Sequence, residues 1–262
     1  MSNLPLSPLH EAIHKQTAKE MIRDKIVSMI ASGILQRGDE LPSERELSTM
    51  LAVSRETVRG AIQLLAGQGV VQVSQGARTR VARVDVEVGT HRIGVTDPSS
   101  INGYSLEAVH AARLLVETAV AADAARHLGP EDIQRLEASI AAQEQAIDDP
   151  VRFLICDREF HLTIYYASAN RLLADFVVDL YTYMLDHRRI AMAQPGAIEK
   201  SLEDHRFIVR ALKMHNPEAV AAAFSEHILR IHDTSRAVDE SGIARAGSPA
   251  NGAPALRASG GK

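Results

Sequence analysis

The sequence contains a single cysteine, Cys156, and no tryptophan, and aromatic residues make up only 4% of its 262 residues. One cysteine excludes an intrachain disulfide and favours a reducing setting such as the cytoplasm. No apolar run approaches the roughly 18 residues of a membrane helix, and the first residues lack the basic and then apolar pattern of a secretory signal. The composition, 45% hydrophobic and 24% charged, therefore favours a helix-rich protein of about two domains and excludes a helical membrane protein.

The formal net charge of −4 for the whole chain argues weakly against binding to nucleic acid, but the charge is unevenly distributed between its two parts. Residues 1–84 carry a net charge of +3, whereas residues 85–262 carry −7. A basic N-terminal unit followed by an acidic body is typical of a DNA-binding domain joined to a sensing or dimerisation domain.

Residues 41–66 have the pattern of two short helices with a tight turn between them. Ser43 and Glu46 form an S-x-x-E capping box, which starts the first helix and satisfies two backbone amides. Ser54 is placed to cap the second helix. Apolar residues recur at helical spacing in both, namely Leu47, Leu51, Val58, Ala61, Ile62 and Leu65.

The second of these helices carries Arg55, Thr57 and Arg59 near its N-terminus, on the face opposite its apolar residues. Two capped helices, the second with cations at its leading end, predict a helix-turn-helix whose second helix enters a DNA major groove. The alternative is an ordinary helical pair with solvated arginines.

The segments around this pair complete a domain over residues 15–84, after a flexible arm over 1–14. A first helix is expected over about 17–32, ended by Gly33 in the left-handed conformation. Valines at 70–73 and a return over 79–84, with turn residues 74–77 between them, predict a β-hairpin. A hairpin in this place is the wing of a winged helix-turn-helix, and its tip with Gln75 and Gly76 is expected to contact a minor groove or phosphates. The same tip residues are equally compatible with a plain polar turn.

Residues 85–103 have a linker composition, and residues 104–238 are almost wholly helical in pattern. Prolines and glycines divide them into six helices, which predict an antiparallel bundle. The expected helices span about 106–128, 130–148, 151–168, 170–192, 198–215 and 217–238. The last residues, 239–262, are expected to be disordered.

These motifs resemble the GntR family of transcriptional regulators, whose winged-helix domain matches the sequence from Arg37 to Arg59. The resemblance is carried by Arg37-Gly-Asp, by Leu41-Pro-Ser-Glu-Arg-Glu-Leu and by Val53-Ser-Arg-Glu-Thr-Val-Arg. The helical half resembles the FCD effector domain of the FadR subfamily, and six helices rather than seven match its VanR-like branch. The resemblance implies operator DNA as a partner, and the predicted DNA-binding residues are Arg45, Ser54, Arg55, Thr57, Arg59, Gln75 and Gly76.

The chain departs from the family pattern in two places. Gly60 follows the second arginine, where the family usually has glutamate. The wing reads Gly76-Ala-Arg-Thr-Arg-Val in place of the common Gly-x-Gly-x-Phe-Val.

Asp157 and His161 lie four residues apart on one predicted helix, so both project from one face and are placed to bind one metal. Such a pair is more often a surface hydrogen bond, and a single inward histidine is usually a satisfied core residue. His205 and His227 lie midway along two other predicted helices. The resemblance adds that metal-binding FCD domains have the pattern Asp-x-x-x-His, His, His, which falls on Asp157, His161, His205 and His227. It therefore implies a divalent transition metal, with Zn as the first choice and Ni, Mn or Fe also compatible with these ligands.

Three side chains are candidates to bind a carboxylate effector in the helical domain. Arg113 and Glu117 are spaced as an intrahelical ion pair, but the resemblance implies that an arginine at position 113 faces the carboxylate of a ligand. Arg188 is a further candidate, and Asn170 is a helix cap or a ligand contact.

The sequence therefore predicts a mainly α protein with an N-terminal winged helix-turn-helix and a C-terminal helical bundle. The expected function is that of a homodimeric, ligand-responsive DNA-binding regulator, as a repressor, with no enzymatic activity and no membrane partner. Two alternatives stay open: a metal-dependent enzyme in the bundle, and a DNA-binding protein whose bundle only dimerises around a structural metal.

Overall fold

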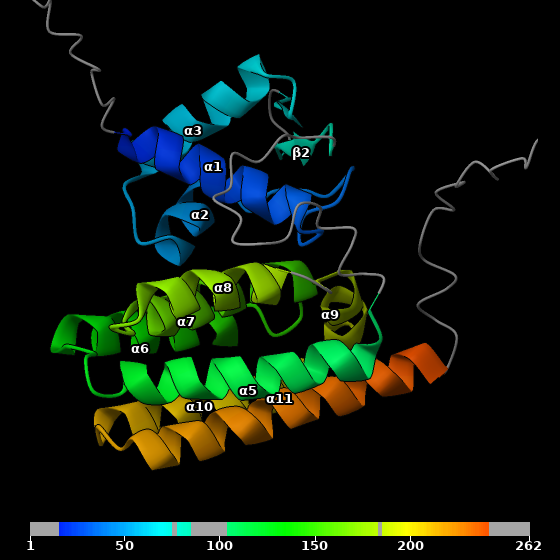
Figure 1. Cartoon of the computed structure of the whole chain (residues 1–262). Coiled ribbons are helices and arrows are strands. Elements are labelled where there is room, and N and C mark those ends of the chain that lie inside the picture. Colours follow the sequence, from blue (N-terminus) through cyan, green and yellow to red (C-terminus); the bar gives the residue numbers. More distant parts are fainter. Residues whose placement is uncertain (1–15, 75–77, 85–103, 183–184, 241–262) are drawn as a thin grey trace, which may run out of the picture. The chain divides into compact units, whose positions relative to one another are not determined.

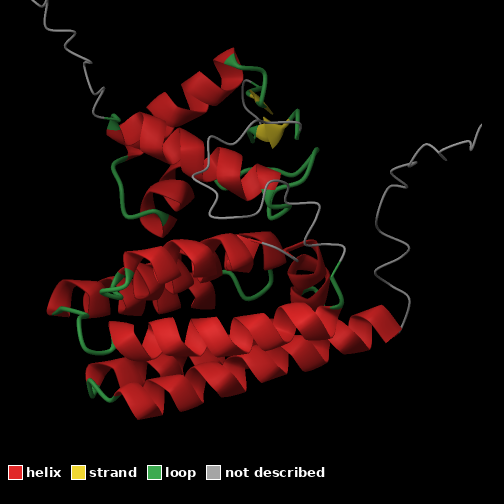
Figure 2. Ribbon diagram, in the orientation of Figure 1, coloured by secondary structure: helices red, strands yellow, loops and turns green. Residues whose placement is uncertain are grey.

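The computed structural model describes residues 16–74, 78–84, 104–182 and 185–240. For residues 182, 185–187 and 239 it describes the backbone but not the side chain. The main division of the chain into two compact units falls between Gly89 and Thr90. Helices dominate both units (Figure 2). Among the described residues, no helix is long and apolar enough to cross a membrane.

The N-terminal unit is built on three helices, α1 (Ala18–Ala31), α2 (Glu44–Met50) and α3 (Arg55–Gly67), with α1 and α2 both packed on α3. The predicted stop of α1 is confirmed, because Gly33 has a φ of +82° and Leu35 donates its N–H to the carbonyl of Met29. The core consists of apolar side chains from all three helices and the loop after α1, among them Ile26, Met29, Leu35, Leu47, Val58 and Leu65.

The helix pair α2 and α3 has the predicted caps. Ser43 and Glu46 form the reciprocal capping box, with Oε2 of Glu46 accepting from the N–H of Ser43 at 2.7 Å. The hydroxyl oxygen of Ser54 accepts from the N–H of Thr57 at 3.1 Å and starts α3. Between the helices Ala52 has a φ of +51°, a left-handed conformation that turns the chain within a few residues.

The wing is shorter than predicted. Strand β1 (Val71–Gln72) pairs antiparallel with β2 (Arg80–Val81), with Val71 opposite Val81. The segment before α2 adds a bridge between Glu40 and Arg80, which also form an ion pair. The predicted tip residues Gln75 and Gly76 lie outside the described residues.

The second unit contains α5 (Leu106–Ala124), α6 (Pro130–Glu144), α7 (Pro150–Tyr166), α8 (Arg171–Thr182), α9 (Leu185–Met192), α10 (Ala197–Lys213) and α11 (Pro217–Glu240). Prolines occupy the first position of α6, α7 and α11, where a missing N–H costs nothing. The long helices α5 and α11 lie side by side, and α10 packs on α11 and α6 (Figure 1). These helices form the predicted bundle.

The helix expected over 170–192 is described as two helices, α8 and α9, with residues 183–184 between them outside the described part. Both helices pack on α7, but α8 also packs on α5, whereas α9 packs chiefly on α11. Helix α9 thereby brings Arg188, whose side chain is 2% exposed, over α7. The described part of the unit therefore has seven helices where six were predicted, and the assignment to the VanR-like branch, which rested on six, stays a prediction.

Candidate metal centre and DNA-binding surface

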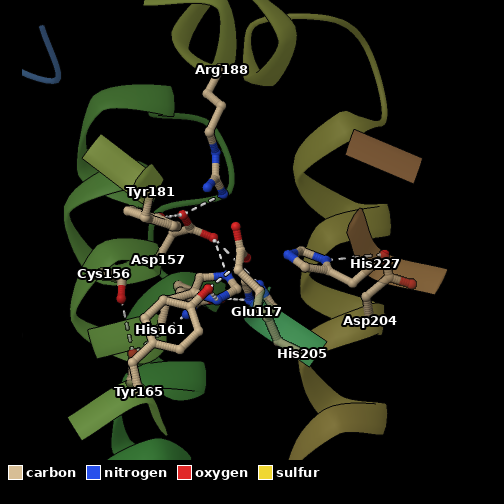
Figure 3. A network of polar contacts seen from close by, with 12 residues as sticks. Glu117, Cys156, Asp157, His161, Tyr165, Tyr181, Arg188, Asp204, His205 and His227 are labelled. Atoms are coloured by element: carbon tan, nitrogen blue, oxygen red, sulfur yellow. Dashed lines mark hydrogen bonds and ion pairs between the residues drawn. The ribbon is translucent and has the colours of Figure 1, made fainter. Parts of the chain in front are cut away.

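The four predicted ligand residues lie together inside the helical unit. Asp157 and His161 project from one face of α7, His205 comes from α10 and His227 from α11 (Figure 3). All four are fully buried, and one ligand atom from each lies within 4.8 Å of the others. Three helices thus converge on a single point.

The four atoms at that point have no hydrogen-bond partner among the described residues. They are Oδ1 of Asp157 and Nε2 of His161, His205 and His227. Oδ1 of Asp157 lies 3.6 Å from Nε2 of His161 and 3.4 Å from Nε2 of His205. A buried polar atom without a partner costs about 1–3 kcal/mol, so four directed at one point are costly unless a bound cation satisfies them together. The residues therefore fit a metal.

The other ring nitrogen of each histidine is held by a neighbouring side chain. Nδ1 of His205 lies 2.7 Å from Oε1 of Gln143. Nδ1 of His161 lies 3.2 Å from the hydroxyl of Tyr165, and Nδ1 of His227 lies 3.4 Å from Oδ2 of Asp204. An acceptor at Nδ1 places the proton there and leaves the Nε2 lone pair free to bind a metal.

The second carboxylate oxygen of Asp157 is engaged from above the cluster. Nη2 of Arg188 donates to Oδ2 at 2.7 Å, and the hydroxyl of Tyr181 donates to the same atom. Figure 3 shows Arg188 extending from α9 toward Asp157. These contacts orient the carboxylate so that only Oδ1 faces the three imidazoles.

Burial and neighbouring charge set the protonation states that a metal requires. Burial lowers the pKa of His161 to about 4 and holds the pKa of His205 well below its usual value, so both imidazoles are neutral near pH 7. Burial opposes the ionised form of Asp157, but Arg188 and His161 outweigh it and hold the pKa of that carboxyl well below its usual range. Neutral imidazoles and an ionised carboxylate are the forms that bind a metal.

Arg113, the first candidate for an effector contact, forms an ion pair with Glu117. Its Nε and Nη2 both donate to the carboxylate of Glu117, at 2.5 and 3.4 Å. Burial acts against ionisation of Glu117, but Arg113 more than offsets it and lowers the pKa. The hydroxyl of Tyr165 donates to Glu117 at 2.7 Å and accepts from His161. Arg113 thus connects through Glu117 and Tyr165 to a ligand histidine.

The other two effector candidates lie in different places. Arg188 borders a small hollow next to the cluster, together with Arg113. Asn170 accepts the N–H of Leu173 through its side-chain oxygen at 3.1 Å and caps α8. It borders a separate hollow at the surface, which shares no lining residue with the first.

The predicted DNA-binding residues of α2 and α3 are at the surface of the N-terminal unit. Arg45 and Arg55 are exposed, and Thr57 is half-buried, with its hydroxyl 2.8 Å from that of Ser54. Arg59 is exposed but paired, with Nη2 donating to Oε2 of Glu44 at 2.9 Å. A contact of Arg59 with a base or phosphate through its Nε edge therefore requires this ion pair to open.

Sequence reasoning missed the side chains that orient the ligands. Tyr165 lies four residues after His161 on α7, and that helical spacing could have predicted their contact. Gln143 and Asp204 had no such signal, because each reaches a histidine on another helix, at 62 and 23 residues' separation. Tyr181 likewise reaches Asp157 from α8.

Two families match the chain in sequence. Residues 18–81 match "Bacterial regulatory proteins, gntR family", and residues 108–230 match "FCD domain". Among curated proteins, the chain is 26% identical over 238 residues to "HTH-type transcriptional repressor NanR" of Salmonella newport (strain SL254), covering 86% of this chain and 87% of the relative. It is 27% identical over 223 residues to the NanR of Edwardsiella tarda (strain FL6-60), covering 82% and 84%. Among solved structures, "E. coli McbR/YncC" has the same fold, with a TM-score of 0.50, 20% identity and coverage of 87% of this chain and 99% of that one.

Proposed function

The chain belongs to the GntR family of bacterial transcriptional regulators and joins its DNA-binding domain to an FCD domain, and from this premise we propose that it is a homodimeric, cytoplasmic repressor controlled by a metal-dependent organic-acid sensor. It is a regulator and not an enzyme. The metal, the acid, the dimer and the direction of control are the parts that we propose.

The observation that carries the metal is the set of four buried ligand atoms without partners, all within 4.8 Å of one another. Three imidazole nitrogens and one carboxylate oxygen suit Zn first, and also Ni, Mn or Fe. Such a site would supply a fixed positive charge and a coordination position open to an oxygen ligand. The chain's own side chains, Arg188 and Tyr181 at Asp157 and Gln143 at His205, orient the ligands for it.

The DNA-binding role rests on the exposed arginines of the helix pair. A guanidinium can donate two hydrogen bonds to O6 and N7 of guanine or to one phosphate, which lysine cannot reproduce. Arg55 and Arg59 near the start of α3 are the candidates for base contacts, and Arg45 at the start of α2 is the candidate for a phosphate contact.

Large apolar side chains that are exposed to solvent in the single chain support a dimer. Leu115 on α5 is 74% exposed and Leu172 on α8 is 63% exposed, and these two helices pack against each other. Two copies related by a twofold axis would present two α3 helices to a palindromic operator. An acid effector then causes release of DNA only if it binds the DNA-bound geometry of the dimer and the released geometry with different affinity.

Operator binding is tested with a sequence selected from random DNA by the purified protein. We expect Arg55→Ala to weaken binding by about 1–3 kcal/mol per lost two-point base contact, measured by fluorescence anisotropy at fixed salt. Arg135→Ala, an exposed arginine in the helical unit, is the matched control. If Arg55→Ala, Arg59→Ala and the parent bind alike, α3 is not the helix that contacts bases.

The sensor is tested by a thermal-shift screen of sugar acids, hydroxy acids and aromatic acids, each with and without chelator. We expect one class to raise the melting temperature only in the metal-loaded protein and to release the operator in the anisotropy assay. Stabilisation by metal with no acid affecting DNA release would instead favour a purely structural metal. Sedimentation of the free protein tests the dimer.

A further inference from the structure

Lys19, an exposed lysine in the first turn of α1, has its methylene stem against α3. Helix α1 packs on α3, and a Cβ added at Gly60 would lie 3.4 Å from Cβ and 3.5 Å from Cδ of Lys19. Since glycine has no side chain, the stem of Lys19 can lie beside the backbone of α3 at this point. A lysine placed in this way packs its stem on the protein and keeps its ammonium group in water.

The ammonium group of Lys19 is available to an anion from outside the chain. It forms no ion pair or hydrogen bond with the residues that the structure describes. The neighbouring acid, Glu20, instead accepts from the N–H and the hydroxyl of Thr17, at 2.8 and 2.6 Å. The N-terminal end of a helix is the positive end of its dipole, and a cation there is unfavourable. The stability of α1 therefore does not account for a lysine at this position.

The helix pair α2 and α3 carries no net charge of its own. Three arginines and three glutamates balance each other, namely Arg45, Arg55, Arg59, Glu44, Glu46 and Glu56. Arg59 lies between two of the acids, 2.9 Å from Glu44 and 3.8 Å from Glu56. Cations that neutralise phosphates supply much of the affinity for DNA. A DNA-binding surface centred on these two helices therefore needs cations from the elements beside them, and α1 offers Lys19.

We propose that Lys19 is a further DNA-binding residue, which contacts a phosphate of the operator beside α3. The inference rests on the proposed role of α3 in the major groove and adds a cation from α1 to that surface. The ammonium of lysine is a point charge, which suits a phosphate oxygen. A phosphate contact raises affinity and fixes position but does not read sequence. Lys19 therefore acts alike on every DNA sequence.

The test compares Lys19→Met with the parent on two duplexes, the one selected from random DNA and a scrambled one of equal length and composition. Methionine keeps an unbranched stem against Gly60 but has no charge. We expect affinity for both duplexes to fall by roughly five- to tenfold per bound chain at about 0.1 M salt, because one phosphate is no longer neutralised. The plot of log affinity against log salt should become shallower by about 0.9 per bound chain.

Three further variants locate the effect. Lys19→Arg keeps the charge and should bind both duplexes nearly as the parent does. Lys200→Met, at an exposed lysine of α10 in the other unit, should leave affinity and salt dependence unchanged. Arg55→Ala should weaken binding to the selected duplex more than to the scrambled one, as loss of a base contact does. In urea, Lys19→Met should be at least as stable as the parent, because it removes a cation from the positive end of a helix.

Two outcomes would overturn the proposal. In one, Lys19→Met keeps the affinity and salt dependence of the parent, or loses affinity only because the protein is less stable. In the other, the loss is confined to the selected duplex, which would indicate a base contact. Either result removes only this assignment if Arg55→Ala still weakens binding to the selected duplex. If Arg55→Ala bound that duplex as the parent does, the proposed role of α3 itself would be wrong.

Discussion

The orientation of His205 depends on one amide side chain. Gln143 accepts from Nδ1 of His205 through Oε1, and its own Nε2 donates to Ser139 at 3.4 Å. Ser139 in turn donates to the carbonyl of Cys156, next to Asp157 on α7. The chain of contacts fixes which end of the amide faces the histidine, and hence which ring nitrogen faces the cluster.

Replacing Gln143 with leucine should therefore weaken metal binding while leaving the helices intact. Loss of a side chain that orients a metal ligand typically reduces affinity by about 10–100-fold. Competition with a coloured chelator measures the change. Gln145→Leu, an exposed glutamine two residues further on, is the control. Equal affinities for the two variants would show that His205 is oriented by packing alone.

The ligand residues could be predicted from the sequence to different extents. Asp157 and His161 are set on one face of α7 by helical spacing, so their proximity follows from local geometry. His205 and His227 lie on other helices, and only the family resemblance connected them to the pair. The contact of Arg188 with Asp157 could not be predicted from the sequence, because it depends on how α9 is placed over α7.

At the scale of the elements, α3 carries a glycine where its helix has room for a methyl group. A Cβ added at Gly60 would lie 3.4 Å from Cβ and 3.5 Å from Cδ of Lys19, an ordinary van der Waals contact with a long side chain on α1. Glycine inside a helix costs about 0.5–1 kcal/mol relative to alanine.

Gly60→Ala should thus raise the free energy of unfolding by about 0.5–1 kcal/mol in urea titrations. The paired control is Gly67→Ala, at the end of the same helix, where the gain in helix propensity is smaller. A loss of stability in Gly60→Ala would mean that α1 cannot accommodate even a methyl group.

Asp123 links α5 to the turn between α7 and α8. Its Oδ2 accepts from the hydroxyl of Ser168 at 2.8 Å and from the N–H of Ala169 at 2.9 Å. The hydrogen bond from Ser168 and then that from Ala169 lower the pKa of Asp123 despite partial burial. Because the folded-state pKa lies below the unfolded one, this stabilisation is present above the unfolded pKa near 4 and is lost as pH falls through the folded value.

Asp123→Asn should accordingly destabilise the protein by about 1 kcal/mol at pH 7 and by less below pH ~4. Urea unfolding of both proteins at the two pH values measures the difference. Asp148→Asn changes an exposed carboxylate and should show little effect at either pH. A penalty for Asp123→Asn that is the same at both pH values would exclude the ionised form as the source of the stabilisation.

The helix breaks of the second unit were largely predictable, because Pro130, Pro150 and Pro217 stand at the first position of a helix. The separation of α8 from α9 was not, since residues 170–192 contain no proline or glycine. The packing of α8 on α5 and of α9 on α11 is a tertiary effect that the local sequence pattern does not encode. The wing was predicted in place but not in length.

For the whole molecule, we propose that a regulator of this family is built around a bound transition metal. The two units, the caps of the helix pair and the bundle are all consistent with a regulator without metal. Among the described residues, the observation that favours a metal is the set of buried atoms of Asp157, His161, His205 and His227 that lack a hydrogen-bond partner. Metal bound to the folded state alone would add about 2.7 kcal/mol of stability at a free concentration 100 times its dissociation constant.

The most direct test is the number of transition-metal ions per chain, measured by mass spectrometry on protein purified without a metal-affinity tag. We expect about one ion per chain in the parent and in His127→Gln, and almost none in Asp157→Ala or His161→Gln. A parent protein without metal, whose melting temperature is unchanged by added Zn, Ni, Mn or Fe, would contradict the account.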